Sequence, residues 1–139
     1  MVRADLGPAV DRSQNQGIGN IAEVFGTANV DGIRISGSPA TGLNIRGLGP
    51  TELVTGAQNL DVRGNIDGGH GPAGDVIDAS HVAPGTVDDL LLIGTDGNDT
   101  LAGSPGDDRV FGGNGDDRLE GHGGNDLLDG GTGVNVIIP

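Results

Sequence analysis

Residues 94–138 read, nine at a time, as GTDGNDTLA, GSPGDDRVF, GGNGDDRLE, GHGGNDLLD and GGTGVNVII. Every unit has glycine at its first and fourth places and an aliphatic residue at its eighth. The sixth place is Asp in four units and Asn in the last. Chance does not hold four columns in register over five consecutive units, so this stretch predicts a repetitive fold built from very short units.

The residue types predict how one unit folds. Glycine accepts positive φ and close backbone approach, so the first six residues can form a tight turn that exposes carbonyl oxygens. The last three residues form a short strand whose central aliphatic side chain points inward. One unit cannot bury that side chain alone, so we expect stacked units to share a thin core. The shared side chains are those of Leu101, Val110, Leu119, Leu128 and Ile137.

Two units make one coil with a strand on each side, so units two apart become stacked neighbours. Asp99 then lies beside Asp117, and Asp108 lies beside Asp126. Stacked carboxylates repel each other unless a cation sits between them. Calcium accepts about six to eight oxygens at flexible geometry, including backbone carbonyls, whereas magnesium prefers a strict octahedron and keeps its waters. Zinc is disfavoured because the chain has no Cys and only three His.

The pattern G-G-x-G-x-D-x-U-x resembles the RTX (repeats-in-toxin) family of hemolysin-type calcium-binding repeats, over about the last third of the chain. The resemblance implies an all-β fold: a parallel β-roll, or right-handed β-solenoid, regular in the C-terminal part and degenerate in the N-terminal part. It also implies calcium ions between adjacent turns, held by the sixth-place Asp and by turn carbonyls. One ion is expected between Asp99 and Asp117, one between Asp108 and Asp126, and a weaker one between Asp117 and Asn135.

The candidate metal ligands are therefore sixth-place acids, two third-place residues and the turn glycines. They are Asp75, Asp96, Asp99, Asp108, Asn114, Asp117 and Asp126, with Gly94, Gly97, Gly103, Gly106, Gly112, Gly115, Gly121 and Gly124. The fifth-place residues Asp107 and Asp116 are interpreted as additional negative charge at the turn surface.

Composition predicts a fold that depends on bound ions. The 139 residues include 29 Gly and two Phe but no Trp or Tyr, so little large apolar surface is available to offset chain entropy. Twenty acidic and seven basic residues give a net charge of −13, which opposes compaction without counter-ions. That charge argues against nucleic acid or anionic membranes as partners. No stretch is long and apolar enough to predict membrane insertion.

The chain is expected to divide into three segments. Residues 1–16 are polar and irregular and are interpreted as a flexible N-terminal segment or linker. Residues 17–93 keep the ninefold spacing only in part and are interpreted as degenerate coils of the same solenoid, with alternating strands at residues 33–35, 43–45 and 60–62. The alternative is a separate β-sandwich packed on the solenoid's end. Residues 94–139 form the regular calcium-binding roll.

Two stretches before residue 94 extend the pattern. Residues 67–78 resemble a further unit with a two-residue insertion, in which Asp75 is either a ligand or a solvated turn residue. Residues 87–93, VDDLLLI, are the most apolar stretch and predict a buried strand that enters the regular array.

The last unit is atypical, as terminal repeats usually are. Its apolar residues predict an open strand edge that pairs with another copy end to end, or with a missing cap. The N-terminus lacks the apolar region of a Sec-type signal. The resemblance instead implies type I secretion by an uncleaved C-terminal signal, although the sequence stops at Pro139, directly after the last repeat.

The sequence favours a non-enzymatic, calcium-binding module of a secreted, extracellular bacterial protein. The module folds on meeting external calcium and stabilises or helps to export other domains of a larger exoprotein. Two alternatives stay open: a domain of a polysaccharide-modifying exoenzyme, and an adhesin or surface-structural module. Catalysis is disfavoured because His70, His81 and His122 are scattered in Gly- or Pro-rich turns.

Overall fold

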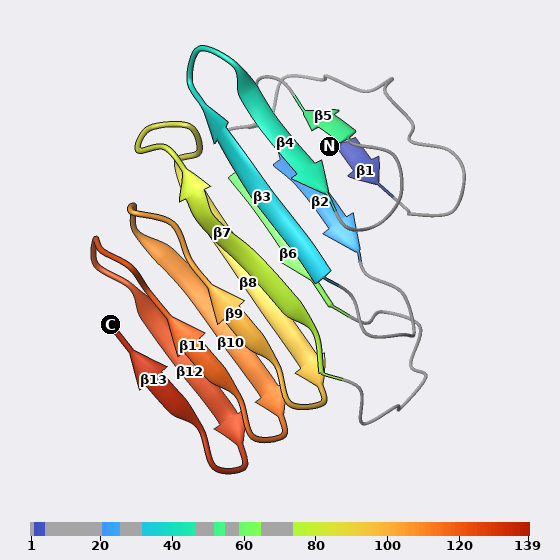
Figure 1. The fold of residues 1–139 in the computed structure, drawn as a ribbon, viewed down its shortest axis with the longest axis vertical. Coiled ribbons are helices and arrows are strands. Elements are labelled where there is room, and N and C mark those ends of the chain that lie inside the picture. Colours follow the sequence, from blue (N-terminus) through green and yellow to red (C-terminus); the bar gives the residue numbers. More distant parts are fainter. Residues whose placement is uncertain (1, 5–20, 26–31, 47–51, 55–58, 65–73) are drawn as a thin grey trace.

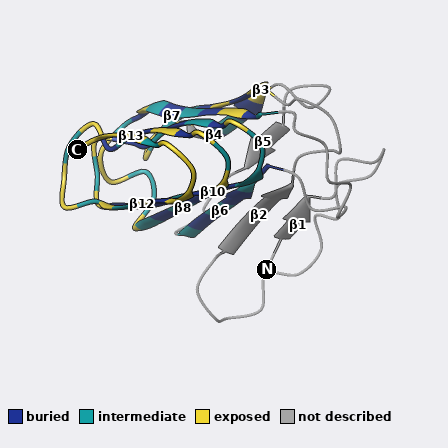
Figure 2. Ribbon diagram, turned by 90° about the horizontal axis from the view of Figure 1, so that it is seen from below, coloured by how far each residue is buried: buried dark blue, intermediate teal, exposed yellow. Residues whose placement is uncertain are grey.

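The computed structural model describes residues 2–4, 21–25, 32–46, 52–54, 59–64 and 74–139, and the regular secondary structure in this part of the chain is entirely β. The strands form two sheets, which face each other as two layers (Figure 2). Sheet A consists of β1 (Val2–Ala4), β2 (Ile21–Phe25), β6 (Asn59–Arg63), β8 (Asp89–Asp96), β10 (Asp108–Asn114) and β12 (Leu127–Thr132), in that order. Sheet B consists of β13 (Val136–Ile138), β11 (Arg118–Glu120), β9 (Thr100–Ala102), β7 (Val76–Val82), β3 (Gly32–Ser38), β4 (Gly42–Arg46) and β5 (Glu52–Val54).

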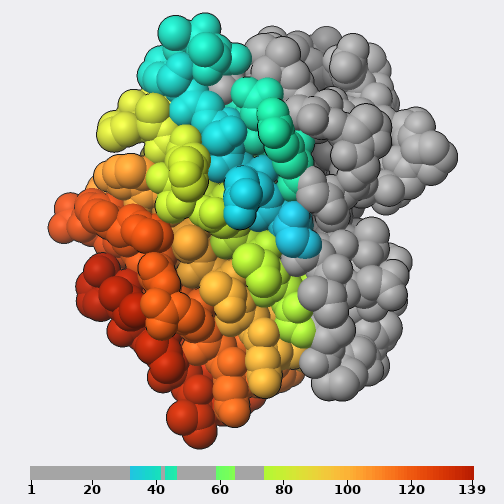
Figure 3. Space-filling model, in the orientation of Figure 1, coloured from blue at the N-terminus to red at the C-terminus, as the bar shows by residue number. Residues whose placement is uncertain are grey.

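From β8 onward the chain alternates between the two sheets, and strands that lie one coil apart pair in parallel (Figure 1). Leu119 is in register with Leu101 on one side and with Ile137 on the other. Val110 is in register with Leu128. Units two apart are therefore stacked neighbours, and the predicted parallel β-roll is confirmed. Successive coils appear as adjacent bands on the face shown in Figure 3.

The core is a single thin layer of side chains between the two sheets. Leu90, Leu92, Leu101, Val110 and Leu119 are fully buried, at 0% exposure each. β8 buries every second residue, which confirms the strand predicted at residues 87–93. The two remaining eighth-place residues are less buried than expected: Leu128 is partly buried, and Ile137 is 46% exposed. Both belong to the last coil, where no further coil covers the layer.

The N-terminal half departs from the expected solenoid at one point. β3 pairs in parallel with β7, as a coil should, but β4 pairs antiparallel with β3, and β5 antiparallel with β4. The interpretation of residues 43–45 as a solenoid strand is therefore wrong. The three residues that separate β3 from β4 can close a hairpin, and Thr41 N donates to Ser38 O at 3.1 Å, but a parallel crossover needs a much longer connection.

The two sheets are continuous between the N-terminal and the repeat segments. β6 pairs with β8 in sheet A, and β7 pairs with β9 in sheet B, so the described residues do not form a separate β-sandwich. β1, within the segment expected to be irregular, pairs in parallel with β2. The rest of that segment, and most of the candidate unit at residues 67–78, lie outside the described residues. Within the described ranges, no helix has the length and hydropathy to cross a membrane.

Candidate metal centre

The turns of the roll line two edges, which differ in direction and in sequence. The first edge contains the turns that lead from sheet A to sheet B, at residues 94–99, 112–117 and 130–135. The second edge contains the turns that lead back, at residues 103–108 and 121–126. Each edge therefore stacks turns at intervals of one coil, which places their sixth-place residues in one column.

On the first edge the sixth-place residues form a hydrogen-bonded column. The amide of Asp75 donates to Asp99 Oδ1 at 2.7 Å, and the amide of Asp99 donates to Asp117 Oδ1 at 2.8 Å. The amide of Asp117 donates to Asn135 Oδ1 at 2.8 Å. Each of these side chains thus accepts from the backbone of the preceding coil, and the column extends one coil beyond the regular repeat.

Asp75 reaches this column through a longer insertion than the sequence indicated. β6 and β8 place Gly64 opposite Gly94, so Gly64 is the first-place glycine of the turn that ends at Asp75. The step from Gly64 to Asp75 is six residues longer than the step from Gly94 to Asp99, rather than two. The insertion leaves the register intact, because Ile77 still pairs opposite Leu101.

The first-place glycines provide the space that the carboxylates occupy. A Cβ added at Gly94 would lie 2.1 Å from Asp99 Oδ2 and 2.6 Å from the carbonyl oxygen of Gly112. A Cβ at Gly112 would likewise lie 2.2 Å from Asp117 Oδ2 and 2.8 Å from the carbonyl oxygen of Gly130. Each acid therefore folds back over its own first glycine and faces a carbonyl of the next coil.

Two of these carboxylate oxygens are buried without a hydrogen-bond partner. Asp99 is 1% exposed and Asp117 is 2% exposed, and the Oδ2 atom of each lacks a donor. Burial, together with the charges of Asp117, Asp75 and Asp96, raises the pKa of Asp99 to about 7. Burial also raises the pKa of Asp117 above its ordinary value. A cation beside these oxygens would reverse the direction of both shifts.

The second edge holds a shorter column. The amide of Asp108 donates to Asp126 Oδ1 at 3.1 Å, but the residue opposite Asp108 in the preceding coil is Leu90, which has no carboxylate. Burial raises the pKa of Asp108 to about 6, against the effect of hydrogen bonds from Ser104. The structure therefore brings Asp108 and Asp126 together as predicted, with one inter-coil interval between them.

The third-place candidates lie in a separate side-chain ladder. Asn114 Nδ2 donates to Asp96 Oδ1 at 2.7 Å, and Thr132 Oγ1 donates to Asn114 Oδ1 at 2.8 Å. These contacts run along the exposed outside of the first edge, parallel to the sixth-place column. Asp96 still contributes to the raised pKa of Asp99 through its charge.

The fifth-place residues have a role that the sequence interpretation missed. The amide of Asp116 donates to Asn98 Oδ1 at 2.9 Å, and the amide of Val134 donates to Asp116 Oδ1 at 2.7 Å. On the second edge, the amide of Asn125 donates to Asp107 Oδ1 at 2.8 Å. Asp107 and Asp116 are thus not only surface charge but also tie one coil to the next. The recurrence of Asp or Asn at this place was the signal that could have shown it.

The donor set fits a hard cation that accepts main-chain oxygens. In the described residues, no three acidic, histidine or cysteine side chains gather into a metal cluster. A cation between two coils would therefore have to be held by two carboxylates together with carbonyls such as that of Gly112. Calcium accepts this mixture at flexible geometry, whereas magnesium requires a stricter octahedron and zinc prefers nitrogen and sulfur ligands.

The raised pKa values predict that acid stabilises the calcium-free fold. A carboxyl whose pKa is raised by folding contributes stability that is complete below its unfolded value and lost as the pH rises through the folded value. For Asp99 that window runs from 3.8 to about 7. In chelator, the fraction of folded chain should therefore decrease as the pH is raised from about 5 to 7.

With saturating calcium the order should reverse, because protons compete with the ion for the same carboxylates. Far-UV circular dichroism at both pH values, with and without chelator, checks this prediction. A folded fraction in chelator that stays level or rises with pH would contradict it.

Comparison with known proteins identifies the repeat. The family model of the RTX calcium-binding nonapeptide repeat, which spans four copies, matches residues 93–128 and again residues 102–137. No curated protein and no solved structure matches the chain. The match covers the turns that stack the sixth-place acids, and repeats of this family bind calcium ions.

Proposed function

Residues 93–137 are RTX calcium-binding nonapeptide repeats, and from this we propose that the chain is a calcium-dependent folding module of a secreted bacterial protein. The observation that carries the proposal is the column of buried acids on the first edge. Asp99 and Asp117 each hide a carboxylate oxygen that has no donor. Such oxygens are costly to bury unless a cation sits beside them.

The proposed ions lie between successive sixth-place residues. On the first edge the pairs are Asp75 with Asp99, Asp99 with Asp117, and Asp117 with Asn135, and the last is the weakest because Asn carries no charge. On the second edge the pair is Asp108 with Asp126. In each case the carbonyl oxygen of the first glycine in the next coil is the additional calcium ligand.

The proposed mechanism is a transition from disorder to order. The whole chain has a net charge of −13 and the repeat has a core one side chain thick, so the repeat gains too little from apolar burial to hold its acids together unaided. An ion that binds only the folded coil adds its binding free energy to stability. The repeat is therefore unfolded in a calcium-poor cytosol, and its coils stack in sequence outside the cell.

This transition suits a parent protein that is exported unfolded, as in type I secretion, and that gains stability once outside. The repeat then acts without catalysis, as a folding and stabilising unit for neighbouring domains. Among the described residues, Arg34 and Arg46 lie opposite each other in sheet B, whereas Arg63 lies in sheet A, so these three arginines do not line one face along which an anionic polysaccharide could bind.

Hydrogen exchange tests the proposal at the coils themselves. The amides of Asp99 and Asp117 donate across coils, so they should exchange fast in chelator and become protected when calcium is added. Magnesium at the same concentration should give little protection. Slow exchange of both amides in chelator, unchanged by calcium, would show that the coils stack without ions and would contradict the proposal.

The open end of the roll supports a second role, in self-association. Val134 is 78% exposed, Leu127 54% and Val136 50%, and among the described residues the strands β12 and β13 each have one edge without a paired strand. Exposed apolar residues on open strand edges pair readily with another chain. In calcium, sedimentation should show a concentration-dependent dimer that Val136→Asp weakens. A single monomeric species for the wild-type chain at all concentrations would exclude this role.

A further inference from the structure

The turn at residues 103–108 differs from the other turns in backbone conformation at its second and fourth places. Thr95, Gly113, His122 and Gly131 all have positive φ, with values of 95°, 120°, 74° and 74°. Ser104, at the same place in turn 103–108, does not have a positive φ. Thr95 and His122 show that a side chain at this place does not by itself prevent the positive value. Ser104 precedes Pro105, and the residue before a proline is restricted to extended conformations.

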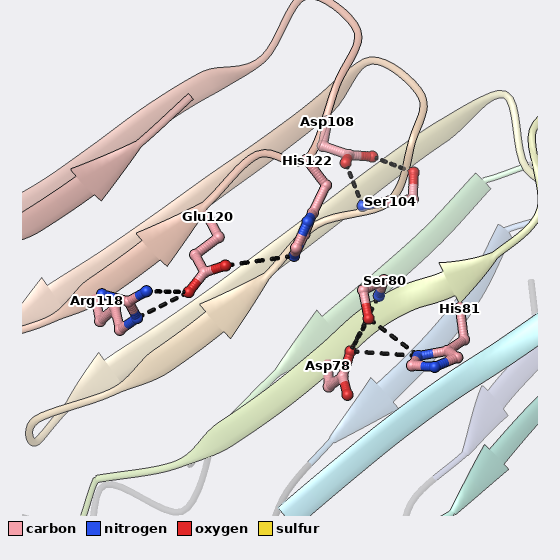
Figure 4. Close-up of polar contacts among 8 residues, drawn as sticks. All are labelled: Asp78, Ser80, His81, Ser104, Asp108, Arg118, Glu120 and His122. Carbon is pink, nitrogen blue, oxygen red and sulfur yellow. Dashed lines mark hydrogen bonds and ion pairs between the residues drawn. The ribbon is translucent and has the colours of Figure 1, made fainter.

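Ser104 is bound to the carboxylate of its own turn (Figure 4). Its amide donates to Asp108 Oδ2 at 2.5 Å, and its hydroxyl donates to Asp108 Oδ1 at 2.9 Å. The hydroxyl oxygen in turn accepts from the amide of Gly106 at 3.1 Å. Ser104 is 4% exposed and Asp108 is 2% exposed, so these contacts are closed to water. Both oxygens of Asp108 are thus occupied within one turn.

The acids of the first edge are in the opposite state. Asp99 and Asp117 each use Oδ1 to accept from the preceding coil, and each keeps Oδ2 buried without a donor. A cation at those oxygens would displace no hydrogen-bond donor. At Asp108 it would meet an N–H and an O–H whose hydrogens already point at the carboxylate, and it would have to displace at least one of them.

We propose that Ser104 competes with calcium for the Asp108 carboxylate, so that the two edges of the roll fill at different calcium concentrations. The Asp99–Asp117 edge fills first. The Asp108–Asp126 edge fills later, once the Asp108 carboxylate has lost its hydrogen bonds from Ser104. This inference rests on the proposed function, because it orders the ions which that function requires. It makes Ser104 a residue that sets calcium affinity without being a ligand.

Residue-resolved calcium titration of the full chain tests this order. In assigned amide NMR spectra, Asp99 and Asp117 report the first edge, while Ser104 and Asp108 report the second. In the wild-type chain the first edge should saturate at the lower calcium concentration. The second should follow at a concentration at least about tenfold higher, which corresponds to the loss of one hydrogen bond to a charged group.

Two variants and one matched control isolate Ser104. Ser104→Gly introduces the residue that stands at the same place in two other turns, as Gly113 and Gly131. Ser104→Ala removes only the hydroxyl and keeps the backbone as restricted as it is with serine. Both should lower the second-edge midpoint by about tenfold and leave the first edge unchanged. Ser80→Ala is the control. Ser80 Oγ also donates to an aspartate, Asp78 Oδ1, at 2.6 Å, but both residues lie in β7, outside the turns that stack the acids (Figure 4). It should move neither midpoint.

The outcomes separate this inference from the proposed function. Edges that titrate together in the wild-type chain would overturn the role of Ser104 while leaving calcium-dependent folding intact. The same conclusion would follow if both Ser104 variants left the second-edge midpoint in place. Absence of any response to calcium at either edge would overturn the proposed function, and this inference with it.

Discussion

Asp99→Asn is expected to raise the calcium concentration at the folding midpoint by at least about tenfold, since site affinity follows the number of charged ligands. Asp99 lies in the middle of the first-edge column and contacts the backbone of Asp75 while the amide of Asp99 contacts Asp117. Its replacement therefore removes a charged ligand from two inter-coil intervals. Without calcium, the variant should be more stable than the wild-type chain, because it no longer buries a carboxylate that its acidic neighbours repel.

The wild-type column shows that an amide fits this place, since Asn135 Oδ1 accepts from Asp117 in the same geometry. The matched control is Asp116→Asn, which removes the same charge one place before Asp117. Asn already stands at the fifth place as Asn98 and Asn125, so the control should change stability by no more than about 0.5 kcal/mol. Equal shifts in the calcium midpoint for the two variants would mean that net charge, rather than the column, governs binding.

Gly94→Ala is expected to prevent calcium-induced folding at room temperature. The added Cβ would lie 2.1 Å from Asp99 Oδ2 and 2.6 Å from the carbonyl oxygen of Gly112, so both the carboxylate and the next coil would have to move. Overpacking at two such contacts should cost about 3 kcal/mol or more. For a thin core this is a large share of total stability. Gly94 does not have positive φ, so the effect is steric.

A control separates this clash from the general cost of losing glycine. A Cβ at Gly32, outside the repeat, would meet nothing within 4 Å. Gly32→Ala should fold in calcium with a midpoint close to that of the wild-type chain. Circular dichroism of the two variants across a calcium titration gives the comparison. A Gly94→Ala chain that folded like its control would show that the first-place glycine is not required for coil approach.

The regular repeat could be predicted from sequence because each column has one physical cause. The eighth-place residues needed a shared core, which fixed the stacking of Leu101 on Leu119, and the sixth-place acids followed in register. The local pattern left Asp75 open between a ligand and a solvated turn residue, and the structure shows that Asp75 is buried and that its amide contacts Asp99. The length of the insertion before Asp75 was predicted wrongly. The glycines at residues 68 and 69 have the pattern of a unit's start, whereas Gly64 is the first-place glycine of this turn.

The antiparallel pairing of β3 with β4 could not be obtained from periodicity alone. An alternating strand has the same pattern whichever direction its neighbour runs, so only the short connection through Pro39 distinguishes a hairpin from a coil. The Ser104–Asp108 contacts were also out of reach. The pattern shows Ser where other turns have Gly, Thr or His, but not that its hydroxyl would occupy the carboxylate.

We propose above that calcium ions between the coils make this chain fold. Far-UV circular dichroism of the purified chain at neutral pH, titrated with calcium and then separately with magnesium, tests this directly. We expect a transition from coil to β structure with calcium, little change with magnesium, and full reversal by chelator. A chain that is already fully β-structured in chelator, and that calcium leaves unchanged, would contradict it.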